Sequence, residues 1–218
     1  MNCMRKLWLT VLTVALAGGL IVIAQSASAS FIAYDSTRIT GNQNWTGALG
    51  MDFDVNSPIR ILELGAYDSG QLGITGPISV GIFDRTSQTL VGVSASISTS
   101  DPLTGLSRYE DITDFVLGVG SYSIVAQGFG LTDPNGNVTF GGTGPNTDTG
   151  GGLISFVGLA RYTSTQSLVF PTTIDSGPFN RYDAGTFKFE AVPEPATMLL
   201  LGLGLVGLAG IRRKFKKQ

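Results

Sequence analysis

Acidic side chains are the main candidates for chemistry in this chain, because it contains no histidine and its single cysteine is Cys3. Without histidine the usual general base and the commonest metal ligand are missing, so a zinc site and a Ser-His-Asp hydrolase are excluded. A glycosidase needs only two carboxylates, and five could supply them: Glu63, Glu110, Asp111, Asp114 and Glu190. Their spacing does not separate a catalytic pair from surface charge. We therefore predict no catalytic residues and no enzymatic activity, with a carboxylate-dependent glycan hydrolase as the weakest alternative.

Oxygen-rich segments offer a second kind of chemistry, since Ca²⁺ takes carboxylate and amide oxygens as ligands. One such segment contains Asp133, Asn135 and Asn137 around Gly136. Asp-Pro-Asn-Gly is above all a turn sequence. A plain turn is the main prediction, a calcium site the alternative, and no other cofactor is expected.

A second polar series has the ligand spacing of an EF-hand calcium loop: Asp52, Asp54, Asn56 and Glu63. That loop has glycine at its sixth position, where this chain has Ser57. The segment also alternates polar with apolar residues, as a half-buried strand does. We expect these polar side chains to face solvent.

Trp45 is the one large aromatic in the polar segment 42–47. An indole there either caps a hydrophobic core or stacks on a sugar, since the ring is apolar with one polar edge. Core packing is the favoured interpretation. Sugar stacking belongs to the alternative function, a carbohydrate-binding module.

The elements that must position these residues are strands. Alternation is clear at 51–56 and 91–98, and long helical periodicity is absent. Turn-forming residues separate further predicted strands, which are Ile59 to Tyr67, Ile78 to Asp84, Tyr122 to Phe129, Leu153 to Leu159 and Thr186 to Ala191. The alternation slips between Ile61 and Leu62, which predicts a bulge. Many short strands predict an all-β fold, an antiparallel β-sandwich of jelly-roll type over residues 30–191.

The stretch from Leu131 to Gly152 is rich in Gly, Thr, Asn and Asp. It predicts a long loop, with a small hairpin at Asn137 to Gly141.

The N-terminal segment has the features of a secretory signal peptide over residues 1–29. Arg5 and Lys6 precede an apolar run from Leu7 to Ala24, and Ala27 and Ala29 form a small-residue cleavage site. An N-terminal signal helix is expected, and an uncleaved anchor is the alternative.

The C-terminal segment, residues 192–218, has three parts. Val192, Pro193, Glu194 and Pro195 form a short extended segment, because proline disfavours helix. The apolar run 196–211 would rise about 24 Å as a helix, somewhat less than the roughly 30 Å hydrocarbon core of a bilayer. The basic tail 212–218 follows, and it begins with Arg212, Arg213 and Lys214. This order predicts a membrane helix with a cytoplasmic basic stop.

These three parts, in this order, resemble the PEP-CTERM sorting signal of Gram-negative bacteria. The resemblance implies that an exosortase, a membrane-embedded enzyme, recognises the tail and cuts near Pro193 to Pro195. It also implies a link to exopolysaccharide and biofilm. The middle of the chain is similar to a β-sandwich domain of unknown function common in such proteins, through Asn56-Ser57-Pro58, Gly81 to Asp84 and Gly120 to Tyr122.

The charge of the middle region differs from that of the whole chain. The full sequence carries a net charge of -2, but residues 30–191 hold seven basic and 15 acidic residues, a net charge of -8. Such a domain should repel nucleic acid, so no nucleic-acid partner is expected. The sequence therefore predicts an exported protein of the cell envelope or extracellular matrix. Its expected partners are exosortase, the membrane before processing, and exopolysaccharide, and its role is structural or binding.

Overall fold

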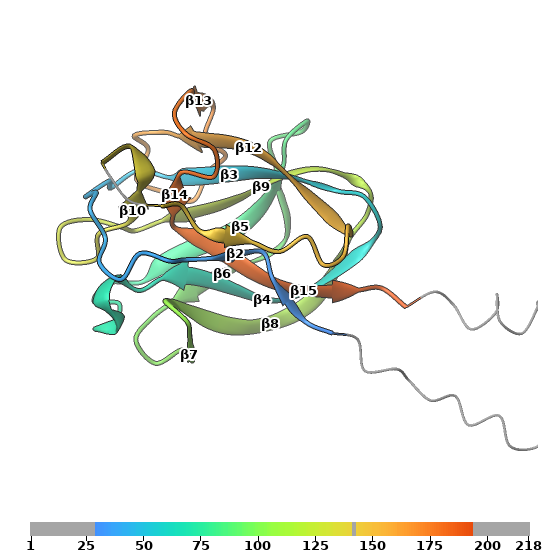
Figure 1. Ribbon diagram of the computed structural model, residues 1–218, viewed down its shortest axis with the longest axis horizontal. Coiled ribbons are helices and arrows are strands. Elements are labelled where there is room, and N and C mark those ends of the chain that lie inside the picture. Colours follow the sequence, from blue (N-terminus) through green and yellow to red (C-terminus); the bar gives the residue numbers. More distant parts are fainter. Residues whose placement is uncertain (1–28, 141–142, 194–218) are drawn as a thin grey trace, which may run out of the picture.

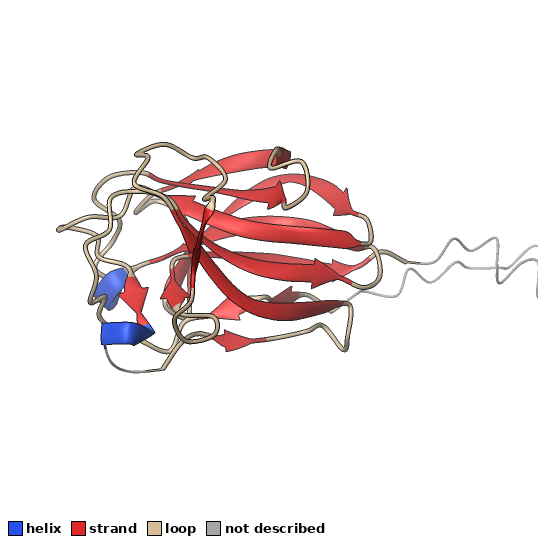
Figure 2. Ribbon diagram, turned by 90° about the horizontal axis from the view of Figure 1, so that it is seen from above, coloured by secondary structure: helices blue, strands red, loops and turns tan. Residues whose placement is uncertain are grey.

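Two antiparallel β-sheets packed face to face form the part of the chain that the computed structural model describes, residues 29–140 and 143–193 (Figures 1 and 2). The all-β, antiparallel prediction is confirmed. Several predicted features lie outside the described residues: the signal helix with Ala27, the membrane helix 196–211, Glu194, Pro195, and the basic residues Arg212, Arg213 and Lys214. Ala29 is described and exposed.

The five-stranded sheet has the order β1 (Phe31–Ile32), β15 (Gly185–Ala191), β4 (Ile59–Tyr67), β8 (Ser107–Leu117), β7 (Leu103–Thr104). The six-stranded sheet has the order β13 (Thr173–Asp175), β12 (Ile154–Tyr162), β3 (Leu49–Val55), β9 (Gly120–Gln127), β5 (Ile78–Asp84), β6 (Leu90–Ile97). Two short pairs join loops: β10 (Gly136–Asn137) with β14 (Tyr182–Asp183), and β11 (Asn146–Thr147) with β2 (Tyr34–Asp35). Two 3-10 turns, η1 (Ser69–Gln71) and η2 (Val138–Phe140), complete the described elements.

Most predicted strands are present. β4 and β5 have the predicted bounds, and β3, β6, β9, β12 and β15 lie close to theirs. The bulge in β4 is confirmed, because Ile61 and Glu63 pair with adjacent residues of β15 and leave Leu62 without a partner in that ladder.

The hydrophobic core lies between the two sheets. Phe53 of β3 packs on Phe187 of β15, with ring centroids 4.9 Å apart, and both side chains are fully buried. A second, smaller cluster lies on the outer face of the six-stranded sheet, where Phe170 covers Phe83 and Val125. The chain after β12 therefore shields a face that the sequence pattern assigns to solvent.

The prediction that the polar side chains of β3 face solvent is wrong for Asp52. Its side chain is 0% exposed, and the Nε of Arg161 donates to both of its carboxylate oxygens at 2.8 Å. Arg85 adds a contact at 3.4 Å. The prediction is wrong because Arg161 and the chain around Phe170 cover this part of the sheet, which a local alternation pattern cannot reveal.

The predicted hairpin at 137–141 is also wrong within the described residues. Gly136 and Asn137 instead pair with Asp183 and Tyr182, and Val138–Phe140 form the turn η2. This segment is fixed by a distant strand rather than by its own neighbours.

The two ends of the described chain lie at the same end of the molecule, since β1 pairs with the last part of β15 and the Val192 N–H donates to the Pro58 carbonyl at 3.3 Å (Figure 1). The loops that precede β3 and β15 lie at the opposite end. No helix among residues 29–140 and 143–193 has the length and apolar character needed to cross a bilayer.

Candidate functional site

A cavity of about 350 Å³ lies at the end of the sandwich that holds the loops before β3 and β15. We call this the loop end, and it is opposite to the end at which Val192 lies. The size of the cavity is at the lower end of the range for small-molecule sites. Its lining combines four aromatic side chains with four polar ones, and these are Trp45, Phe140, Tyr162, Tyr182, Gln43, Asn137, Asp175 and Arg181. The segment before β3, the end of β12, and the region from β13 to β14 supply most of them, so the cavity depends on the whole fold.

Two aromatic rings make a corner of the cavity. Trp45 and Tyr162 meet edge to face, with centroids 5.6 Å apart and planes at 88°. The Trp45 indole N–H donates to the Thr163 carbonyl at 3.2 Å, which fixes the ring and occupies its polar edge. Trp45 is partly buried and packs against the core as predicted, yet it also borders the cavity. The two interpretations of Trp45 are therefore compatible.

Phe140 and Tyr182 differ in exposure. Phe140 is 63% exposed and stands at the rim, whereas Tyr182 is 2% exposed. The Tyr182 hydroxyl donates to Asp175 Oδ2 at 2.6 Å. Burial raises the pKa of Tyr182, and the hydrogen bond to Asp175 raises it further, so the phenol stays protonated and acts as a fixed donor.

Arg181 forms the polar wall and is itself 6% exposed. Its Nη1 pairs with Asp175, and its Nε and Nη2 donate to Asn137 Oδ1 at 3.3 and 3.1 Å. Nη2 also donates to Thr139. The guanidinium is therefore held by the protein rather than left free for a ligand.

Four amides join the loops behind this wall, and we call them the amide clasp: Asn42, Gln43, Asn135 and Asn137. Gln43 Oε1 accepts from Asn135 at 2.8 Å and from Asn137 at 3.0 Å. Asn42 and Asn137 exchange two further bonds. Two groups at the cavity have no hydrogen-bond partner among the described residues, Gln43 Nε2 and the Tyr162 hydroxyl, and these can bind a ligand.

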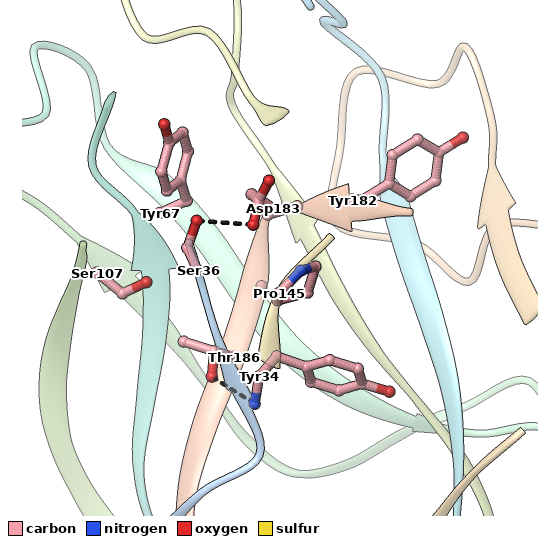
Figure 3. A pocket seen from close by; sticks show the side chains of 10 residues that line it. Tyr34, Ser36, Tyr67, Ser107, Pro145, Tyr182, Asp183 and Thr186 are labelled. Atoms are coloured by element: carbon pink, nitrogen blue, oxygen red, sulfur yellow. Dashed lines mark hydrogen bonds between the residues drawn. The ribbon is translucent and has the colours of Figure 1, made fainter. Parts of the chain in front are cut away.

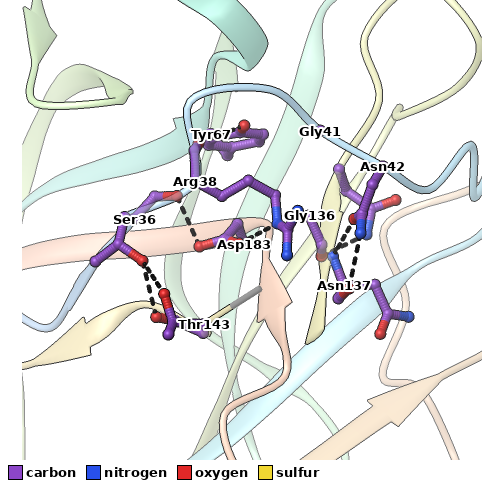
Figure 4. A network of polar contacts seen from close by, with 12 residues as sticks. Ser36, Arg38, Gly41, Asn42, Tyr67, Gly136, Asn137, Thr143 and Asp183 are labelled. Atoms are coloured by element: carbon purple, nitrogen blue, oxygen red, sulfur yellow. Dashed lines mark hydrogen bonds and ion pairs between the residues drawn. The ribbon is translucent and has the colours of Figure 1, made fainter. Parts of the chain in front are cut away.

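Asp183 lies beside the clasp (Figure 4). A Cβ at Gly136 would collide with the Asp183 carboxylate, so only glycine permits this close approach. Ser36 donates to Asp183 Oδ1 at 2.6 Å, while Arg38 Nε stays 3.7 Å from Oδ2. Burial raises the pKa of Asp183, and Ser36 and Arg38 offset this only in part.

A small cavity of about 10 Å³ adjoins Asp183 and is lined also by Ser36, Tyr67 and Thr186 (Figure 3). It has room for about one water molecule. It is too small for any larger ligand, so the aromatic cavity is the candidate site.

The residues proposed for calcium have separate partners. Asp133 accepts from the backbone N–H of Thr75 at 2.9 Å and of Gly76 at 3.3 Å, whereas Asn135 and Asn137 belong to the amide clasp. No group of three or more acidic, histidine or cysteine residues able to hold a metal occurs in the described parts of the chain. Calcium binding at this segment stays a prediction.

The carboxylates considered for catalysis lie on the sheets and do not line the cavity. Glu63 pairs with Lys188 at 2.7 Å, Glu190 pairs with Arg60 at 3.4 Å, and Glu110 accepts from the Ser96 N–H at 2.8 Å. Glu63 faces Asp111 across β4 and β8, but Lys188 already binds Glu63. Asp114 is exposed.

Of the sorting segment, the structure describes Val192 and Pro193. Both follow β15 directly, and Pro193 is exposed. Sequence reasoning had found Trp45 and Asn137 but not Gln43, Tyr162, Asp175, Arg181 or Tyr182. These residues come from three separate segments of the chain, near 43, near 162 and over 175–182, and carry no local motif, so no signal in the sequence alone marks them.

The fold and the cavity define an antiparallel β-sandwich protein with an aromatic site at its loop end. Residues 191–214 match the family model of the PEP-CTERM protein-sorting motif, which confirms the resemblance seen in the tail. The C-terminal segment is thus a PEP-CTERM sorting motif, which supports an exported protein that is sorted by exosortase and implies a membrane-anchored stage followed by surface exposure. No curated protein matches the chain.

Proposed function

We propose that the β-sandwich is a non-catalytic, glycan-binding module that holds the exported protein in an extracellular polysaccharide matrix. In this proposal a sugar unit of the exopolysaccharide enters the aromatic cavity. The proposal includes a jelly-roll type for the sandwich, which fits a chain that passes repeatedly between the two sheets.

The observation that carries the proposal is the chemical make-up of the cavity. Pyranose rings present apolar C–H faces and polar hydroxyl edges, so they bind where aromatic faces and hydrogen-bonding groups converge. Trp45 and Tyr162 supply the faces, and Gln43 Nε2 and the Tyr162 hydroxyl supply unoccupied polar groups.

Hydrogen bonds within the protein hold two side chains of the site without a ligand. Trp45 is fixed by Thr163, and Gln43 is fixed by Asn135 and Asn137. Fixed side chains lose little conformational entropy on binding, which favours affinity for a weakly interacting ligand such as a sugar.

The position of the cavity agrees with a surface role. The cavity is lined from β10, β14 and the end of β12, and these lie at the end of the sandwich opposite to the end of β15 (Figure 1). A polymer can therefore reach the cavity from the side that faces away from the C-terminal segment.

The direct test is a glycan array and calorimetry with the exported protein. We expect binding to a limited set of glycans, and Tyr162→Phe and Trp45→Ala should weaken it by about ten-fold or more. Tyr162→Phe keeps the ring and removes only the free hydroxyl, so it separates binding from folding.

Phe179→Ala is the matched control, since Phe179 is an exposed aromatic outside the cavity, 77% exposed. It should bind as the unchanged protein does. Absence of binding to every glycan at millimolar concentration, or equal loss in Phe179→Ala, would rule out the proposed function.

A further inference from the structure

We propose that the cavity is selective for uncharged sugar units and rejects uronic acids and other anionic glycans. This inference rests on the proposed function and adds the chemical class of the ligand. Three features of the described residues support it: the state of the one cation at the cavity, the pairing of every other cation, and the chemistry of the free groups.

Arg181 is the one cation among the described residues that line the cavity, and it is already neutralised. Asp175 pairs with its Nη1, Nε and Nη2 donate to Asn137 Oδ1, and Nη2 also donates to Thr139. A carboxylate ligand would have to compete with Asp175 at close range, where two like charges repel. Arg181 is the side chain that could have recognised an anion, and its ion pair with Asp175 makes it unavailable to an anionic ligand.

The other cations of the sandwich are also paired with carboxylates. Every basic residue between 29 and 193 forms an ion pair with a carboxylate: Arg38, Arg60, Arg85, Arg108, Arg161, Arg181 and Lys188. Acidic residues outnumber them, with a net charge of -8 over residues 30–191. The surrounding field is negative and repels anionic polymers.

The groups left for a ligand are both uncharged. Gln43 Nε2 donates only, and the Tyr162 hydroxyl can donate and accept. Such a pair matches sugar hydroxyls, which also donate and accept, and provides no charge to offset the desolvation of a carboxylate.

Calorimetry on the exported protein tests this with two ligand series, neutral oligosaccharides of glucose, galactose and mannose and oligosaccharides of uronic acids. We expect a neutral series to bind with an affinity that changes less than about two-fold between about 50 and about 500 mM NaCl. Uronic acid oligomers should bind at least about ten-fold more weakly at the lower salt.

Asp175→Asn provides a charge test within the cavity. Loss of this carboxylate leaves Arg181 uncompensated, so the affinity for uronic acid oligomers should rise by several-fold and become salt-dependent. The matched control is Asp111→Asn, which makes the same change in net charge at an exposed site on β8 and should not alter selectivity.

The outcomes separate the two proposals. Tight, salt-dependent binding of uronic acids by the unchanged protein, with or without Ca²⁺, would overturn the inference and leave glycan binding intact. Equal gains in Asp175→Asn and Asp111→Asn would also overturn it, because the effect would then come from net charge alone. If neither ligand series binds, the proposed glycan-binding function is itself ruled out.

Discussion

Asp52 lies on the outer face of the six-stranded sheet, where a side chain ordinarily meets water, yet it is fully buried. Arg161 and Arg85 flank it, and their side chains are 13% and 18% exposed. A buried carboxylate between two guanidinium groups is costly to disrupt, because removal of one partner leaves the others desolvated without compensation.

We expect Asp52→Ala to lower the free energy of unfolding by about 3 kcal/mol, the lower end of the cost of a broken buried pair, since both arginines keep some contact with solvent. Urea unfolding measures the change. Asp111→Ala, at an exposed position, should change stability by no more than about 0.5 kcal/mol. Equal unfolding midpoints for the two variants would contradict the structural role of Asp52.

Asp183 should make stability depend on pH. Its pKa is raised in the folded protein above the ordinary 3.8, chiefly by burial, so the folded state binds the proton more tightly than the unfolded chain does. The stabilising contribution of the protonated form is fully present below the ordinary pKa and is lost as the pH rises through the raised value. The stability of the protein relative to Asp183→Asn should therefore fall as the pH rises from about 4 towards neutral.

Asp84 should make stability depend on pH in the opposite direction, so it serves as the control. Its pKa is lowered, first by the Ser87 N–H and then by the Ser87 hydroxyl and the Thr86 N–H, against the effect of desolvation. Its contribution is present above 3.8 and is lost as the pH falls through the lowered pKa. Unfolding curves between pH 3 and 7 for Asp183→Asn and Asp84→Asn should diverge in opposite directions. If the stability of the two variants changes with pH in the same way, the raised pKa of Asp183 is refuted.

At the scale of elements, the strands that the sequence predicted well are those with a clear local pattern. β4 and β5 both lie in the interior of their sheets, and turn residues border both of them. β8 was not predicted as one strand, because Glu110, Asp111 and Asp114 break its apolar pattern. Charges of this kind are common on strands near a sheet edge, where they discourage pairing with another chain.

The candidate site was harder to predict than the strands. Alternation is a property of neighbouring residues, whereas the aromatic cavity joins segments more than a hundred residues apart, such as those of Trp45 and Tyr182. Packing between distant segments brings these side chains together, and such contacts cannot be derived from the pattern of a single sequence.

A bulge in β12 lies opposite Asp52. Phe156 and Ala160 pair with Phe53 and Met51, so three residues of β12 face one residue of β3. Gly158 sits in this bulge with φ of +79°, and the Phe179 ring packs where a Cβ would be. Both the backbone conformation and the contact require glycine.

Gly158→Ala should therefore destabilise the protein by about 1–2 kcal/mol. Gly118→Ala is the matched control, since a Cβ there meets nothing within 4 Å and φ is not in the left-handed region. That control should be neutral or slightly stabilising, because alanine restricts the unfolded chain. Thermal melts of the two variants measure the difference, and equal melting temperatures would show that the bulge tolerates a side chain.

At the scale of the whole molecule, the tail and the sandwich have separate roles and opposite charge. The tail carries five basic residues at positions 212–218 and the sorting motif, while residues 30–191 carry a net charge of -8. The tail could be interpreted from the sequence because its signal is contiguous. The role of the sandwich could not, since it depends on tertiary contacts.

Replacement of Pro193, Glu194 and Pro195 by alanine should block processing, because the sequence predicts that exosortase recognises this segment. We expect the variant to accumulate at full length in the membrane fraction, as seen by immunoblot and mass spectrometry. Three alanines at exposed residues 86–88 are the control and should leave processing unchanged. Normal processing of the tail variant would contradict recognition at these prolines.

The opposite placement of the aromatic cavity and the chain ends has a mechanical consequence. A pull between a polymer held near Trp45 and an attachment beyond Val192 would run along the strands, since β15 extends from the loop end to the tail end (Figure 1). β15 lies between β1 and β4 and pairs with β4 from Gly185 to Ala191. Such a load shears the whole ladder at once instead of opening it one hydrogen bond at a time, so the sandwich should yield only at high force.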